Sequence, residues 1–441
     1  MNRRTALKSI GAVGVAGALP GALPTNWPTN WPAHRSSADD PIGPDRLYAD
    51  VRQYVALGQH RTATPTDHKT ADWLAESLQK SGFSVDYQSF TARQYLVDES
   101  FLRVQHQQIP AFPQWWSSGK TTQIETAPLV AYDAATPTYA GNIVLVRFPK
   151  DPATAIGAYH NKLIGELAQK QAVAVIAITD GPTGGIILHN VKADAPAWPL
   201  NVLLAGPADE PALQAAIRQK IPVTFHLKSR YNPTATARNV IGKRDRGSKN
   251  LLVVSSPMSG WFTCGGERGP GVALFLGLAR YVAAQNIDAN CLFVSTSGHE
   301  IGQTGMHHFM QELAPKSEAV TLWTHLGSAN ATYRWDDTPT GPVKTSQADP
   351  NRYLLFNEGL KPVVERAYAG LSFIQYPVSA TNKPFGEVAN VAAQGYPRFM
   401  GMAGGHRFHH VPTDGADNTG GAILAPVARA ILSVWAQVLG G

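Results

Sequence analysis

The chain has 441 residues, of which 44% are hydrophobic and 16% are charged. This composition permits a large buried core and excludes a wholly disordered chain. Lys and Arg number 38 against 32 Asp and Glu, and no run of basic residues of the kind that binds phosphates occurs, so nucleic-acid binding is disfavoured. Two cysteines exclude a disulfide framework. We expect two or three domains and no stable membrane span, which needs about 18–20 apolar residues.

The N-terminal segment is predicted to be an export signal. Arg3 and Arg4 form the pair of a twin-arginine leader, and a weakly apolar, Gly- and Ala-rich stretch follows over residues 10–24. Two Asn-Trp-Pro repeats and a Ser-, Asp- and Pro-containing stretch then indicate a linker, so residues 1–44 are assigned to signal and linker. The expected partner is the twin-arginine translocase, and the expected location is the periplasm or the exterior. Because this route carries folded cargo, a metal bound in the cytoplasm could travel with the protein.

The next segment, residues 45–105, is predicted to begin the main domain. Leu47, Val51 and Tyr54 recur at helical spacing, and a second helix begins near Thr64 and ends at Ser81-Gly82. Residues 83–87 alternate between apolar and polar side chains, as in a strand.

Residues 106–232 differ in composition from the segments on either side and indicate an inserted, β-rich domain. Pro and Gly become frequent, and the apolar runs are short. The predicted strands cover 142–148, 174–179, 202–205 and 223–227, with a helix over 155–171.

Residues 233–441 are predicted to complete the main domain. Strands at 239–242 and 250–255, a helix over 271–285 and a strand at 290–296 alternate, and a helix over 422–439 closes the chain. The uninterrupted apolar runs at 251–254 and 291–294 indicate that these two strands are buried on both faces of the sheet. The pattern predicts an α/β fold with a mixed, mostly parallel central sheet sandwiched by helices.

Four segments resemble, in order and spacing, the di-zinc aminopeptidases and their relatives the glutaminyl cyclases. They are the opening helical segment at 57–82, Ala-Arg-Asn-Val-Ile-Gly at 237–242, Gly-His-Glu-Ile-Gly at 298–302, and His-Val-Pro-Thr-Asp-Gly-Ala-Asp-Asn at 410–418. Residues 141–146 and 172–176 of the insert resemble a protease-associated domain. The resemblance implies a zinc-aminopeptidase-like fold and hydrolysis of amide bonds.

The resemblance also implies that the metal site is divergent. Where the family has metal ligands or their orienting Asp, this chain has Pro257, Ser259 and Gly327, which removes one of the two zinc positions. The implied ligands of the other position are retained as Glu267, Glu300 and His410. Two carboxylates and one imidazole leave a fourth position open, as in catalytic zinc sites, so one zinc or similar divalent ion is expected.

Arg268 leaves an alternative open, because it adjoins Glu267 and could neutralise that carboxylate in place of a cation. His406 and His409 flank His410, and either of them could contact the substrate.

His299 stands where the family has its catalytic Glu. With an ordinary pKa of about 6.5, an imidazole there could accept a proton from an activated water, act as a fourth ligand, or have no duty. Cys264, three residues before Glu267, offers an alternative to metal-dependent catalysis. His299 could deprotonate its thiol and create a nucleophile that needs no metal. The alternative for Cys264 is a small packed side chain.

Three functions therefore remain in competition. The first is an exported hydrolase acting on small peptides or amino-acid conjugates with one metal ion. The second is a metal-free Cys264/His299 hydrolase on the same fold, and the third is a non-catalytic binding protein derived from a peptidase. Trp261, Phe262 and Trp323 could line a specificity pocket or belong to the core.

Overall fold

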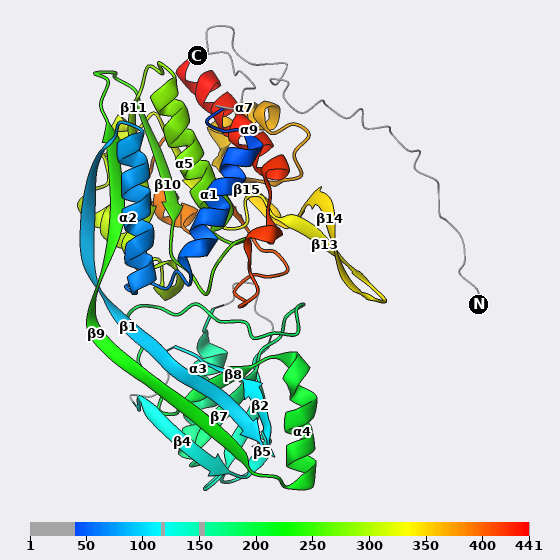
Figure 1. Cartoon of the computed structure of the whole chain (residues 1–441). Coiled ribbons are helices and arrows are strands. Elements are labelled where there is room, and N and C mark those ends of the chain that lie inside the picture. The colour runs from blue at the N-terminus through cyan, green and yellow to red at the C-terminus, as the bar shows by residue number, and fades with distance from the viewer. Residues whose placement is uncertain (1–39, 116–119, 150–154, 441) are drawn as a thin grey trace.

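A computed structural model describes residues 40–115, 120–149 and 155–440. The predicted leader, with Arg3 and Arg4, lies outside these described residues. Figure 1 shows an upper region of sheet and helices and a lower region, joined by two long strands.

The upper region is built on a ten-stranded mixed sheet. Its parallel pairs are β10 with β11, β10 with β12, β12 with β17, and β15 with β16, whereas the remaining pairs are antiparallel. The strand order is β16 (Ile374–Val378), β15 (Arg352–Asn357), β17 (Phe399–Gly404), β12 (Leu322–Leu326), β10 (Leu251–Pro257), β11 (Asn290–Thr296), β9 (Val223–Arg244), β1 (Ser84–Val104) and β2 (Gln107–Pro110), with β4 (Thr122–Ala127) also on β9.

Helices cover both faces of this sheet. Leu252 and Val254 of β10 belong to one buried cluster, and Val253 belongs to another, as the alternation of side chains along a strand requires. The first cluster includes α1 (Pro44–Leu57), α2 (Pro65–Lys80), α5 (Gly269–Ala284), α7 (Lys361–Ala367) and α9 (Gly421–Leu439), and the second includes α6 (Thr304–Glu312) and α8 (Val388–Ala393). The predicted sandwich of helices around a mixed sheet is confirmed, and the parallel part is the core formed by β11, β10, β12 and β17.

Of the described helices, α9 alone is long and apolar enough to cross a membrane by length and composition. In the folded chain, however, most of this helix is buried: Leu424, Ile431 and Trp435 lie in the main core. Its apolar character is therefore explained by packing against α1, α5 and α7.

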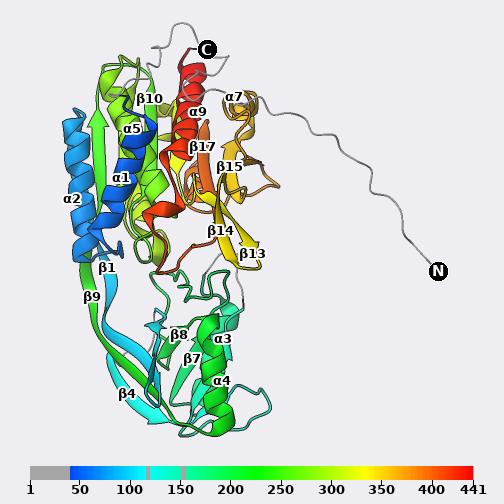
Figure 2. The same cartoon turned by 45° about the vertical axis from the view of Figure 1, so that its right-hand side comes forward.

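The lower region contains a five-stranded sheet. Its order is β3 (Phe112–Pro113), β8 (Val202–Ala205), β7 (Ala174–Ile178), β6 (Ile143–Arg147) and β5 (Leu129–Ala131), accompanied by α3 (Ala158–Gln169) and α4 (Glu210–Gln219). All of these elements fall within 106–232. In contrast, β2 and β4 also fall within that range but pair with β1 and β9, so the large sheet continues into the lower region (Figure 2).

The two long strands differ from the short ones predicted at 83–87, 223–227 and 239–242. β1 and β9 pair from Ser84↔Lys243 to Val104↔Val223, with register shifts near Ala92 and Val97. The middle of β9, residues 230–234, is exposed and includes a proline, so it lacks the apolar alternation of a covered strand. The sequence therefore indicates only the two covered ends of this strand. A hairpin of β13 (Tyr333–Thr338) and β14 (Gly341–Ala348) was not predicted either.

Candidate active site

The candidate site lies where the parallel strands of the large sheet end. The loop after β10 leads to Glu267 and Arg268, immediately before α5, and the loop after β11 carries His299 and Glu300. The loop after β17 carries His409 and His410. Ligands of α/β sheets bind outside the carboxyl ends of the strands, which is the edge at which these loops meet.

The structure brings together Glu267, His409 and His410 as a group that could hold a metal ion. Their ligand atoms all lie within 4.8 Å of one another. The Glu267 Oε1 is 3.2 Å from Nε2 of His410 and 4.0 Å from Nε2 of His409. Glu267 and His410 are buried, whereas the His409 side chain is 22% exposed. Two imidazoles and one Glu form a ligand set that occurs in catalytic zinc sites.

The hydrogen bonds of His410 and Glu267 fit a cation between them. The His410 Nδ1 lies 2.9 Å from the Leu188 carbonyl and would donate its N–H there, so in the neutral ring that a metal would need, Nε2 is the available ligand atom and faces Glu267 Oε1. A second-shell carbonyl of this kind orients metal-binding histidines. Glu267 Oε2 has no hydrogen-bond partner among the described residues, so a ligand atom is free. The group therefore fits a divalent ion.

Asp414 fixes the backbone that carries Glu267. Its carboxylate accepts hydrogen bonds from the backbone N–H groups of Gly266 at 2.7 Å and Glu267 at 3.0 Å. Asn418 donates to the same carboxylate at 2.9 Å. At Gly266 any Cβ would lie 2.6 Å from the His406 ring, so the close approach of these two segments requires glycine.

Arg268 is a buried cation beside this group. Its Nη2 lies 2.7 Å from Glu267 Oε1, both side chains are 1% exposed, and its Nε donates to the Ser259 carbonyl at 3.1 Å. Burial acts to raise the pKa of Glu267, but Arg268 and then His410 outweigh it and hold that pKa well below its usual range. Glu267 is thus an ionised carboxylate that Arg268 partly neutralises, as the sequence allowed.

Glu300, the third ligand implied by the resemblance, is held differently. One oxygen accepts from the Thr62 backbone N–H at 2.6 Å, and the other accepts from Ser259 Oγ at 2.8 Å. Ser259 Oγ also accepts from the Gly298 N–H at 2.8 Å. Glu300 is therefore the anchor of a buried hydrogen-bond network, and the metal-ligand group contains His409 in its place. No sequence signal separated His409 from its neighbouring histidines.

The backbone is closely packed at Pro257 and Gly327, two positions where the resemblance implied lost ligands. Pro257 is paired with Thr296 in the sheet. At Gly327 a Cβ would lie 2.2 Å from the Met402 carbonyl oxygen. A side chain cannot be accommodated at Gly327 unless this backbone moves.

His299 forms a pair with a carboxylate that the sequence did not indicate. Its Nδ1–H donates to Glu387 Oε1 at 3.0 Å, and Glu387 Oε2 lies 3.7 Å from Nε2 of His325. Burial acts to raise the pKa of Glu387, but His299 and then His325 outweigh it and lower that pKa. Glu387 lies just before the short helix α8, in a segment without a motif, so only the folded chain reveals it.

Cys264 is fully buried, and its thiol donates to the Trp261 carbonyl at 2.5 Å. Burial, followed by the charges of Glu267 and Asp414, raises its pKa well above the usual range. Among the described residues no hydrogen bond joins Cys264 to His299. This environment disfavours a thiolate. Cys291 is buried in the core strand β11.

A loop of the lower region closes over the site. Leu188 exchanges two hydrogen bonds with His410, because its N–H also donates to the His410 carbonyl at 3.1 Å. The Val191 N–H donates to the Glu300 carbonyl at 3.0 Å, and Trp261 Nε1 donates to the Asn190 side chain at 2.8 Å. The insert therefore helps to build the site.

Strained backbone gathers here as well. Phe262, Cys264, Gln303 and His410 all have positive φ, of 60°, 49°, 61° and 60°. Such conformations are costly for bulky side chains and cluster at functional sites.

Solved structures with the same fold include a zinc aminopeptidase, a further aminopeptidase and a peptidase precursor. The chain aligns with a zinc aminopeptidase from Bacillus subtilis at a TM-score of 0.68 and 17% identity, covering 90% of this chain and 96% of the other. It aligns with a peptidase M28 precursor from Shewanella amazonensis SB2B at 0.67 and 15%, covering 90% and 93%. An aminopeptidase from Aneurinibacillus sp. strain AM-1 aligns at 0.61 and 17%, covering 89% and 93%. No protein-family model and no curated protein matches the sequence. The expected aminopeptidase-like fold is thus confirmed.

Proposed function

We propose that this protein hydrolyses peptide or aminoacyl amide bonds with one divalent metal ion, zinc or a similar ion, held by Glu267, His409 and His410. The observation that carries the proposal is this buried His-His-Glu group at the strand ends of an aminopeptidase fold. When bound, such an ion would supply Lewis-acid polarisation of a carbonyl and activation of water.

His299 is the general base in this proposal. Its Nδ1 is held by Glu387, so the neutral ring keeps Nε2 as an acceptor. The side chain is 15% exposed while Glu387 is 1% exposed, so the imidazole is the part of the pair that solvent and substrate can reach. A carboxylate behind a histidine fixes its tautomer and stabilises the imidazolium that forms when it accepts a proton.

A second candidate, a non-catalytic binding protein, is favoured by one observation. Arg268 already places a cation against Glu267 at 2.7 Å. In that case the guanidinium substitutes for the metal, and the group serves to hold the loops together.

Metal analysis of protein purified without added zinc separates the two. The hydrolase proposal expects close to one ion per chain, hydrolysis of at least one member of a panel of aminoacyl and peptidyl amides, and loss of that activity with a chelator. Metal-free protein that is inactive, even after zinc is added, would support the binding protein. Two tightly held ions per chain would contradict the single-site proposal.

Cys264→Ser is the matched control for the thiol alternative. Because Cys264 is buried and its pKa is raised, the variant should keep its turnover and iodoacetamide should not inactivate the native enzyme. Loss of activity in both experiments, with chelators harmless, would favour the Cys264/His299 hydrolase instead.

We also propose that the protein is exported to the periplasm or beyond by the twin-arginine route. The support is the Arg3-Arg4 pair ahead of a weakly apolar segment. Replacing both with Lys should retain the precursor in the cytoplasm, and unchanged export would contradict the proposal.

A further inference from the structure

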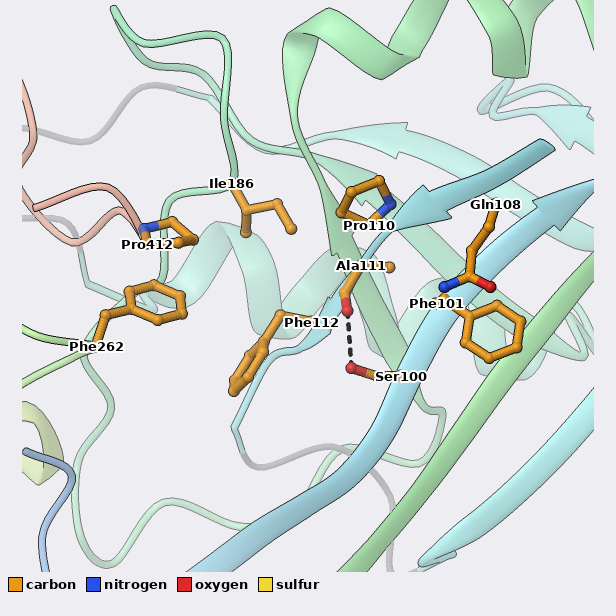
Figure 3. Close-up of a pocket in the computed structure, with 9 residues that line it drawn as sticks. All are labelled: Ser100, Phe101, Gln108, Pro110, Ala111, Phe112, Ile186, Phe262 and Pro412. Atoms are coloured by element: carbon orange, nitrogen blue, oxygen red, sulfur yellow. Dashed lines mark hydrogen bonds between the residues drawn. The ribbon is translucent and has the colours of Figure 1, made fainter. Parts of the chain in front are cut away.

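A cavity of about 300 Å³, here called the far cavity, lies at the edge of the large sheet where β10 and β11 begin. Its lining includes Leu251, the first residue of β10, and residues 290–292, the first three of β11. The candidate site lies at the opposite edge, where these strands end, and a separate cavity of about 420 Å³ beside its loops is lined by Phe262 and Pro412 (Figure 3). The volume of the far cavity reaches the range of small-ligand pockets, about 300–1,000 Å³.

The walls of the far cavity are apolar. Ile241 of β9, Leu292 of β11 and Phe309 of α6 line it, and they belong to the buried cluster on the α6 face of the sheet. Leu313 and Pro315, which follow α6 in the chain, complete the lining on the helix side. Leu313 is 50% exposed, so part of this apolar lining is open to water. Covering such a surface favours the binding of an apolar group.

Most polar side chains of the far cavity are already held by other parts of the chain. Asn290 donates its amide to the Ser248 carbonyl at 2.7 Å, and Asp245 accepts from the backbone N–H two residues later at 2.8 Å. Arg244 Nη1 donates to the Ser81 carbonyl at 2.6 Å. These hydrogen bonds fix the three side chains without a ligand.

Lys243 supplies a cation at the rim of the far cavity. It follows Ile241 by two residues on β9, so its side chain projects from the same face of the sheet as the apolar walls. Its Nζ lies 3.7 Å from Asp86 Oδ2, and the two side chains are 61% and 71% exposed. An ion pair this exposed is weak, so the ammonium is available to an anionic group of a ligand.

We propose that the far cavity binds a linear carboxylate with an apolar chain, of the class of a medium-chain fatty acid. The chain lies over the apolar walls, and the carboxylate lies against the Lys243 ammonium. Charge complementarity selects the anionic end, because a cationic end would be repelled by Lys243. The site goes beyond the proposed hydrolase function and does not depend on it, since none of the proposed metal ligands lines the cavity.

Calorimetry with hexanoate, octanoate and octylamine, each below the concentration at which it forms micelles, tests the class of ligand. Octanoate should bind at one site per chain and at least about 10-fold more tightly than hexanoate, because each buried CH₂ contributes about 4-fold. Octylamine has the same chain and the opposite charge, and it should bind about 5-fold more weakly than octanoate. Octanoate that binds no better than either of the other two would overturn the proposal.

A charge reversal at the rim tests the role of the ammonium. Lys243→Glu should weaken octanoate binding by about 5-fold and reverse the preference, so that octylamine binds more tightly. Lys228→Glu is the matched control, because Lys228 also lies on β9, has an exposed carboxylate partner at 3.4 Å and does not line the cavity. This control should leave both affinities unchanged.

A substitution in the open wall tests the role of the apolar lining. Leu313→Asp removes apolar surface and adds a negative charge, so octanoate binding should fall by at least about 10-fold. Val343→Asp is the control, because Val343 is 51% exposed and lies on the β13–β14 hairpin. Both positions are exposed, so the fold should tolerate either change.

The variants also locate the ligand. Octanoate binding that is unchanged in both Lys243→Glu and Leu313→Asp would place the ligand elsewhere and overturn the proposal. Binding that falls equally in the two control variants would overturn it as well.

Discussion

The two sides of the candidate site differ in whether their polar side-chain atoms already have hydrogen-bond partners. On the open side, formed by Glu267, His409 and His410, a carboxylate oxygen and a ring nitrogen face each other and Glu267 Oε2 is unused among the described residues. On the closed side, formed by Ser259, Glu300 and Gly327, both Glu300 oxygens accept hydrogen bonds, and the Met402 carbonyl packs closely on Gly327.

The difference shows that the residues of the closed side have hydrogen-bond and packing partners of their own. Ser259 bonds to the very carboxylate that remains, and Gly327 lets the Met402 carbonyl approach. Restoring one family residue on the closed side would therefore break existing hydrogen bonds before it could bind an ion. The open side has no such compensation, except for the Arg268 contact with Glu267.

The largest effect is expected from removing a ligand on the open side. His410→Ala should abolish stoichiometric metal binding and with it hydrolysis, because one of three protein ligands is lost. Plasma emission analysis and a hydrolysis assay measure both. Metal content that persists at one ion per chain would show that the open side is not the metal site.

Glu387→Gln should lower kcat by about 10²-fold with little change in KM. The amide retains the shape of Glu387 but cannot stabilise a charged His299, and general-base assistance is worth about 10²–10⁴-fold. His299→Ala should cost at least as much, and the double variant no more than His299→Ala alone, since the two act as a unit. Additive losses would separate Glu387 from His299.

Ser259→Ala tests the closed side. The variant loses the hydrogen bond to Glu300 and leaves the Gly298 N–H without this acceptor, so the free energy of unfolding should fall by about 1–3 kcal/mol. Metal content should not change. Ser84→Ala, at an exposed strand position, is the control and should change stability by less than about 0.5 kcal/mol. Loss of the metal in Ser259→Ala would contradict the division into two sides.

The last prediction concerns acid stability. His60 is paired through its backbone with the segment that carries Ser259. Its backbone N–H donates to the Phe262 carbonyl, and its backbone carbonyl accepts from the Gly260 N–H. Burial lowers the pKa of His60 to about 3.

Below about pH 6.5 the unfolded imidazole binds a proton that the folded one does not, so stability falls as the pH drops from 6.5 toward 3. The slope from this group is at most about 1.4 kcal/mol per pH unit. Urea unfolding across this range should show a smaller slope in His60→Gln, and an unchanged one in the exposed variant His106→Gln. An unchanged slope in His60→Gln would show that His60 does not contribute to the loss of stability in acid.

The fold could be predicted because its signals are local. Apolar runs such as residues 251–254 and the caps of α2 reflect burial and hydrogen bonds within a few residues. The full length of β9 could not, because residues 230–234 in its middle are exposed and have no apolar alternation to mark them.

The site was predicted less completely. Glu267 and His410 were expected as ligands from the resemblance, and they lie together. The placement of Glu300, His409 and Glu387 depends on which loops the fold brings into contact, since partners such as His299 and Glu387 are 88 residues apart in the chain. Spacing in sequence does not contain that information.

The long β1–β9 ribbon connects the upper region to the lower region. Its two register shifts, near Ala92 and Val97, are bulges, and a ribbon bends most readily where its ladder is interrupted. Beyond that interruption, the lower region contacts the site loops through residues 188–191, and these contacts include the pair of hydrogen bonds between Leu188 and His410. A bend of the ribbon would therefore have to carry along the loop that orients the His410 ring, together with the contacts of that loop with Glu300 and Trp261.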